Sequence, residues 1–185
     1  MKKIMAKYTA CICEGGAETA ILNLLLNQNK LIFTRDELLE GEILKTRKGK
    51  DFEQRYLKKD FAGKITVYRI LDSRRENFKI SRAYQHKVEV VNVITAPEIE
   101  MLIICNEGKY QDFEKKKNMS PSEYCKSVLK MKNVKSVSFV KKYFSDISVL
   151  EKSLHEYKRV SKVRKSEKTI YDLLKSIGSK NKKED

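Results

Sequence analysis

Long apolar runs are missing from this chain. No stretch approaches the roughly 18 consecutive apolar residues that a membrane-spanning helix needs. The first residues, Met1-Lys2-Lys3, lead into a short, broken apolar stretch without a signal-peptidase cleavage pattern. We therefore expect a cytoplasmic protein with neither a signal peptide nor a membrane-spanning segment.

Sets of metal-binding cysteines and histidines are missing as well. The cysteines are not spaced as a zinc site, and the two histidines do not complete a set: Cys11, Cys13, Cys105, Cys125, His86 and His155. Cys11 and Cys13 alternate along an expected strand, so both should lie on one face of a sheet as small buried hydrophobes in a reducing compartment. The chain also has no Walker A loop, no internal repeat and no low-complexity linker.

Positive charge is abundant. Lys and Arg number 40 against 25 Asp and Glu, which gives a net charge of +15 over 185 residues. Such a balance favours a polyanionic partner, nucleic acid ahead of an acidic membrane surface. The alternative is that the excess lysine merely keeps the molecule in solution. An apolar fraction of 41% and this length predict one folded domain with a small appendage.

Hydrophobic periodicity predicts strands separated by helices. Strands are expected at 7–13, 31–33, 65–71 and 88–94, and helices at 18–27, 36–40, 99–105, 136–144, 146–157 and 169–177. Ser/Thr-x-x-Glu capping boxes are expected at 34–37, 95–98 and 120–123, the last opening a further helix, and a helical apolar edge at Phe52, Tyr56 and Leu57. This order indicates an α/β fold with a mostly parallel sheet. We expect a core over 1–118 and a basic helical extension over 119–185.

Two acidic residues directly follow predicted core strands. Glu14 follows the first strand and precedes two glycines, which permit a tight turn and a close ligand approach; Asp72 follows the strand at 65–71. The carboxyl ends of parallel strands meet at one edge, so the pair could share Mg²⁺ or Mn²⁺. Each residue taken alone can equally be a capping or turn carboxylate.

A third carboxylate, Glu100, lies in a helix that is apolar on nearly every side and should be buried. A buried carboxylate is costly unless it is paired or bound to a metal. Its alternative role is a structural ion pair with an arginine. Basic residues crowd the same edge and could hold phosphates, unless they form only a solvated loop: Arg69, Arg74, Arg75, Lys79 and Arg82.

These features together resemble the Toprim fold of topoisomerases, primases, OLD-family nucleases and RloB-like defence proteins. Glu14-Gly15 resembles its first motif, Asp72 the first acid of its Asp-x-Asp motif, and the segment 95–104 an RloB-like segment that contains Glu100. The resemblance implies Mg²⁺- or Mn²⁺-dependent phosphodiester cleavage, with Glu14, Asp72 and Glu100 as metal-binding and catalytic residues, and a role in anti-phage defence. The sequence departs from Asp-x-Asp at Arg74, where the second acid is absent.

Three functions therefore stay open. The first is a Toprim-like nuclease acting on DNA or RNA. The second is a non-catalytic nucleic-acid-binding or regulatory module on the same fold, supported by Arg74 and by the basic C-terminal third. The third is a subunit of a larger defence complex, with a partner protein such as an ATPase.

Overall fold

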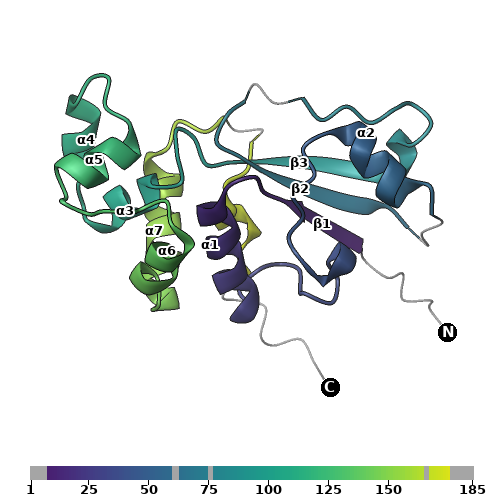
Figure 1. Ribbon diagram of the computed structural model, residues 1–185, viewed down its shortest axis with the longest axis horizontal. Coiled ribbons are helices and arrows are strands. Elements are labelled where there is room, and N and C mark those ends of the chain that lie inside the picture. Colours follow the sequence, from purple (N-terminus) through teal and green to yellow (C-terminus); the bar gives the residue numbers. More distant parts are fainter. Residues whose placement is uncertain (1–7, 60–62, 75–76, 165–166, 176–185) are drawn as a thin grey trace, which may run out of the picture.

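A computed structural model describes residues 8–59, 63–74, 77–164 and 167–175 (Figure 1). Its centre is a three-stranded sheet in the order β1-β2-β3, with every pairing parallel. The strands are β1 (Tyr8–Ile12), β2 (Ile65–Leu71) and β3 (Val88–Ile94). All three were predicted from β-branched and apolar runs, and β1 and β2 are largely buried whereas the middle of β3 is exposed. The mixed α/β class with a parallel sheet is thus confirmed.

Helices and short helical turns separate and follow the strands. The α-helices are α1 (Gly16–Asn27), α2 (Gly49–Phe52), α3 (Met101–Asn106), α4 (Tyr110–Lys115), α5 (Pro121–Ser127), α6 (Val137–Tyr143) and α7 (Ile147–Val160). Shorter or irregular turns are η1 (Leu39–Gly41), η2 (Glu53–Leu57), η3 (Gln85–Lys87) and η4 (Ile170–Leu173). No helix in the described segments is long and apolar enough to cross a membrane.

The two faces of the sheet bury different side chains, as strand alternation requires. Cys11 and Cys13 join the larger hydrophobic cluster, which includes α1, α3 and the C-terminal helices, and both thiols are buried as predicted. Ala10 and Ile12 face the smaller cluster, with Phe52 of α2. Helices therefore flank the sheet on both faces, and α1 lies between the sheet and the α3–α7 helices (Figure 1).

The C-terminal helices pack closely on the segment that follows β3. Helix α7 lies against α3, and α6 lies against α1. Ser120, Ser136 and Asp146 cap α5, α6 and α7 by accepting a backbone N–H, which satisfies donors that a helix start leaves open. The division of the chain at residues 118 and 119 stays a prediction.

Several local predictions were wrong because tertiary pairing outweighed the local pattern. The segment 36–40 is not an α-helix, since Thr9 of β1 donates its N–H to the carbonyl of Glu37 and the segment runs beside the strand. Residues 31–33 form a single bridge, between Leu31 and Leu174, instead of a strand. Of the helix expected at 169–177, residues 176 and 177 lie outside the described residues, and that pairing limits the described part to the short turn η4, which Thr169 and Asp172 cap.

The capping box expected at 95–98 is also absent. The Thr95 hydroxyl donates to the carbonyl of Leu71 at 3.1 Å, which ties the end of β3 to the end of β2. The Glu98 carboxylate accepts from the backbone N–H of Ser122 at 2.9 Å instead of from its own helix start. Helix α3 therefore begins later, at Met101.

Candidate functional site

The register of the sheet brings the ends of β1 and β2 to one edge. Ile12 pairs with Arg69, so Glu14 and Asp72 follow the ends of two neighbouring strands at nearly the same position along them. In open parallel sheets, ligands bind in the crevice beyond the carboxyl ends of the strands. The two carboxylates predicted to meet there do line the same cavity.

Two adjoining cavities form a groove along this edge, which we call the acidic groove. The first, of about 220 Å³, is lined by Glu14, Gly15, Glu18, Arg47, Ile70 and Asp72. The second, of about 210 Å³, shares Gly15, Glu18 and Asp72 with the first and adds Gly16, Ala17, Glu98, Ile99, Glu100 and Lys135. Five carboxylates from four parts of the chain thus face one groove.

Glu18 occupies the middle of the groove. It lies in the first turn of α1, where the helix dipole favours a negative charge, and it lines both cavities. Burial raises the pKa of Glu18, and the neighbouring charges of Asp72 and Glu14 raise it further. A proton or a cation is therefore favoured at this carboxylate.

Glu100 is the most deeply buried of the five carboxylates, with 3% of the residue exposed. Burial raises its pKa, and the nearby Glu98 and Glu18 add to the effect. Within the described segments, no Lys, Arg or His side chain forms an ion pair with it. The ion pair with an arginine, the alternative role for Glu100, is not found among these residues.

Two carboxylates at the ends of the groove do have cationic partners. The Arg47 Nε lies 3.0 Å from Glu14 Oε2, and the Lys135 Nζ lies 3.1 Å from Glu98 Oε1. Although burial raises the pKa of Glu98, the hydrogen bonds from Ser122 and Lys135 outweigh it and lower the pKa. The ionised form of Glu98 is thus favoured, whereas burial disfavours the ionised forms of Glu18 and Glu100.

The donor chemistry of the groove suits a hard divalent cation. All five carboxylates offer oxygen, which Mg²⁺ and Mn²⁺ prefer. No three Asp, Glu, His or Cys side chains of the described residues already surround one point closely enough to form a cage. Mg²⁺ commonly needs only one or two carboxylates, with water and substrate phosphates completing its shell, so the groove fits such an ion.

The basic residues predicted to hold phosphate lie elsewhere. Arg74 donates to both carboxylate oxygens of Glu167, at 2.7 and 2.9 Å, and lines a separate cavity of about 260 Å³. Arg69 is buried on the opposite face of the sheet from α1, against the Phe78 ring at 4.8 Å. Lys79 and Arg82 are exposed between β2 and η3, and neither lines the acidic groove; Arg75 lies outside the described residues.

Sequence reasoning missed Glu18, Arg47 and Lys135 as groove residues. Glu18 carried a usable signal, because it follows Glu14 by four residues and a helical turn places such residues close together. Arg47 and Lys135 carried none, since each reaches the groove from a loop whose path depends on tertiary contacts.

Comparison of the chain with protein-family models, with curated proteins and with solved structures finds no match. A functional assignment therefore depends on the geometry and chemistry of the acidic groove.

Proposed function

We propose that this protein is a Toprim-like nuclease that cleaves nucleic-acid phosphodiester bonds with the help of Mg²⁺ or Mn²⁺. The observation that carries the proposal is the convergence of Glu14, Asp72 and Glu100 on one groove beyond the carboxyl ends of parallel strands. A role in anti-phage defence is part of the proposal through the Toprim resemblance alone.

The buried Glu100 supports cation binding independently of the number of acidic residues. A carboxylate with 3% exposure and no ion pair within the described part of the chain is costly to keep charged. The same side chain lines the cavity that Glu18 and Asp72 line. A divalent cation in the groove would offset this cost for several carboxylates at once.

In this proposal Glu14, Asp72 and Glu100 are the metal-binding candidates, and Glu18 is a fourth carboxylate within the same groove. A bound Mg²⁺ or Mn²⁺ would stabilise charge on the oxygens of the scissile phosphate and help to ionise the attacking water. The residues would orient the ion and the water, and Glu18, whose pKa is raised by burial, is a candidate to carry a proton in the groove.

The test is a cleavage assay on labelled single- and double-stranded DNA and RNA, with Mg²⁺, Mn²⁺ or EDTA. We expect metal-dependent cleavage that falls at least about 100-fold in Glu14→Gln and Asp72→Ala, as for loss of a proton-transfer or metal-binding group. Glu89→Ala is the matched control, because Glu89 is an exposed carboxylate on β3. Full activity in both groove variants would refute the assignment.

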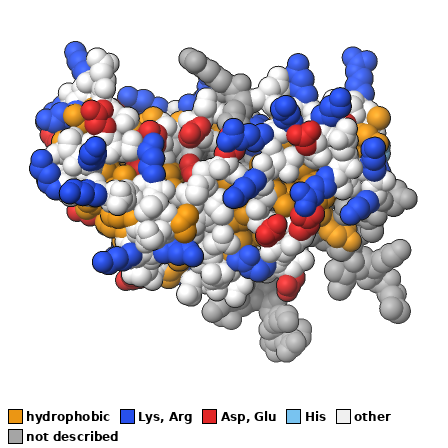
Figure 2. Space-filling view, in the orientation of Figure 1, with side chains coloured by type: hydrophobic (Ala, Val, Ile, Leu, Met, Phe, Trp, Pro, Cys, Tyr) orange, Lys and Arg blue, Asp and Glu red, His pale blue; other side chains and the backbone are white. Residues whose placement is uncertain are grey.

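A second candidate is a nucleic-acid-binding module that does not cleave. Figure 2 shows Lys and Arg side chains spread over one face, including the end formed by α4 and α5. On α5, α6 and the loop between them, five exposed lysines take part in none of the ion pairs of the described residues: Lys126, Lys130, Lys132, Lys141 and Lys142. Such a surface suits phosphate contacts that do not need a metal.

Binding measured across salt concentrations in EDTA distinguishes the two candidates. The binding module predicts a steep salt dependence, with affinity unchanged in Glu14→Gln and Asp72→Ala and no cleavage under any metal condition. Metal-dependent cleavage that both variants abolish would exclude it as the full account.

A further inference from the structure

The segment between η1 and α2 runs along the outer edge of β1. Leu44 donates its N–H to the carbonyl of Cys11 at 2.7 Å and accepts from the N–H of Cys13 at 3.0 Å. Ile12 and Leu44 thus form a parallel bridge. Because the segment continues in the direction of β1, Arg47 emerges beyond the same end of the sheet as Glu14.

Arg47 is the one cation among the described residues that line the Glu14 cavity. Its Nε lies 3.0 Å from Glu14 Oε2, and its side chain is 69% exposed, against 25% for Glu14. An exposed ion pair of this kind contributes at most about 1 kcal/mol. A guanidinium has five N–H donors in a planar fork that matches a phosphate, so the contact uses a small part of its capacity.

Glu14 is also a metal-binding candidate, so one carboxylate has two competing cationic partners. When a divalent cation takes the charge of Glu14, the attraction that holds Arg47 there weakens. The guanidinium, which Leu44 keeps near this end of the sheet by pairing with β1, then faces the groove with its charge uncompensated.

We propose that Arg47 is a phosphate-binding residue that exchanges Glu14 for a backbone phosphate of nucleic acid once a divalent cation neutralises Glu14. This inference rests on the proposed nuclease function and adds a residue that contacts the substrate. It implies that divalent cations and nucleic acid each strengthen the binding of the other, because both favour the state in which Arg47 has left Glu14.

A double-mutant cycle tests the exchange without any cleavage. Binding of fluorescein-labelled single-stranded DNA and RNA is measured in EDTA for wild type, Glu14→Gln, Arg47→Gln and the double variant. Glu14→Gln should tighten binding roughly tenfold, since a charged hydrogen bond to phosphate is gained and a like charge is removed. In the Arg47→Gln background the same substitution should give a gain of about threefold or less.

Salt dependence gives a second readout that a purely structural role would not change. Loss of one phosphate contact lowers the slope of log affinity against log salt by about 0.7 to 0.9. Arg47→Gln should show this decrease with Ca²⁺ present, where Arg47 is released from Glu14.

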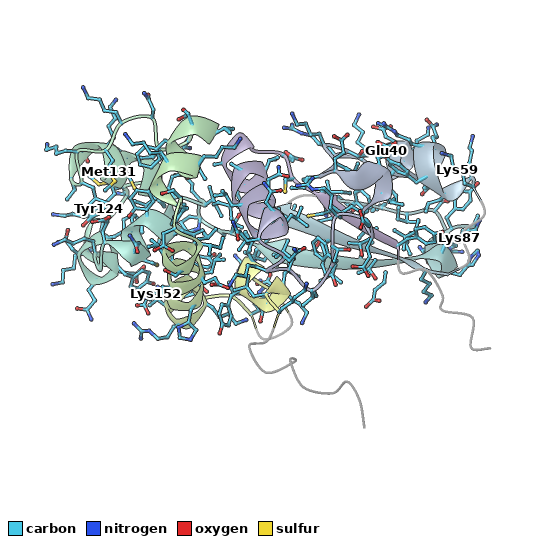
Figure 3. All side chains as sticks on the ribbon, turned by 90° about the horizontal axis from the view of Figure 1, so that it is seen from below. Glu40, Lys59, Lys87, Tyr124, Met131 and Lys152 are labelled. Atoms are coloured by element: carbon cyan, nitrogen blue, oxygen red, sulfur yellow. The ribbon has the colours of Figure 1, made fainter. Side chains whose placement is uncertain are left out.

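Arg55 and Glu40 form the matched control pair. The Arg55 Nη2 lies 2.8 Å from Glu40 Oε2, and the Arg55 side chain is also largely exposed. Neither residue lines the acidic groove, and Glu40 lies on the α2 side of α1 (Figure 3). Glu40→Gln should leave the affinity unchanged in both the wild-type and the Arg55→Gln backgrounds.

The outcomes separate this inference from the function on which it rests. If Glu14→Gln increases the affinity equally with Arg47 present and with Arg47→Gln, the exchange is overturned. Metal-dependent cleavage by wild type would still leave the nuclease function standing. Absence of nucleic-acid binding by wild type, in EDTA and in Ca²⁺, would overturn both. The exchange is supported if Glu14→Gln increases the affinity for nucleic acid only when Arg47 is present and Glu40→Gln does not increase it.

Discussion

Glu18 folds back over Gly15, so that its carboxylate fills the space that a β-carbon on residue 15 would need. Gly15 itself has φ −82° and ψ 150°, an extended conformation that any residue adopts. The glycine is therefore required for room and not for backbone freedom. The sequence had suggested a tight turn at this point, and the structure gives a different reason for the same residue.

Gly15→Ala should separate activity from stability. The added β-carbon displaces the end of the flexible Glu18 side chain, so we expect metal-dependent cleavage to fall about tenfold or more. The free energy of unfolding should stay the same or rise by up to about 1 kcal/mol, because alanine restricts the unfolded chain. Cleavage rates and urea denaturation measure the two effects, and unchanged cleavage would contradict this role for Gly15.

Gly41→Ala is the control, because it should lower stability without changing cleavage. Gly41 has φ +68°, where a side chain is strained, but an added β-carbon would meet no atom within 4 Å. The substitution should lower the free energy of unfolding by about 1 kcal/mol and leave cleavage by the folded protein unchanged.

Glu100→Gln should change how stability depends on pH. The folded-state pKa of Glu100 is raised above its ordinary value of 4.5, with burial as the main cause. The native state therefore holds this proton more tightly than the unfolded chain, so the contribution of Glu100 to the free energy of unfolding falls as pH rises through the raised pKa. Glutamine cannot ionise, and the variant should be more stable than wild type at neutral pH.

Urea denaturation of both proteins at several pH values between about 4 and 8 measures this difference. The gap in free energy of unfolding should widen as pH rises and should narrow when Mn²⁺ is added, because the cation stabilises only the wild-type carboxylate. A gap that neither pH nor Mn²⁺ alters would show that Glu100 is not a charged group in need of compensation.

Arg74→Gln should affect stability and not cleavage. Arg74 and Glu167 are joined by two hydrogen bonds, and the guanidinium lowers the pKa of Glu167 from 4.5 to about 2. This lowered pKa contributes stability above pH 4.5 that is lost as pH falls toward about 2. We expect the substitution to destabilise the protein by up to about 1 kcal/mol at neutral pH.

Acid denaturation and the cleavage assay check this assignment together. The difference in stability between wild type and Arg74→Gln should shrink as the pH falls below 4.5, where Glu167 loses its charge in the unfolded state. A large loss of nucleic-acid affinity, with stability unchanged, would instead support the phosphate-binding role that the sequence suggested for Arg74.

The sequence by itself determined the parts of this protein that depend on local pattern. Apolar and β-branched runs located β1, β2 and β3. Strands β1 and β2 are largely buried and mostly apolar, whereas β3 exposes Glu89 and Val90 and was located by its valines. The same reasoning identified Glu100 as buried and placed Glu14 and Asp72 where two strands end. These properties follow from residues close together in the chain.

Tertiary structure alone decided which charges meet. Glu167 pairs with Arg74 across 93 residues, and Glu98 pairs with Lys135 across 37. Arg47 reaches Glu14 only because Leu44 pairs with the edge of β1. Exposed basic side chains are interchangeable in a sequence pattern, so the folded paths of the loops determine which of them face the groove and which stabilise the fold.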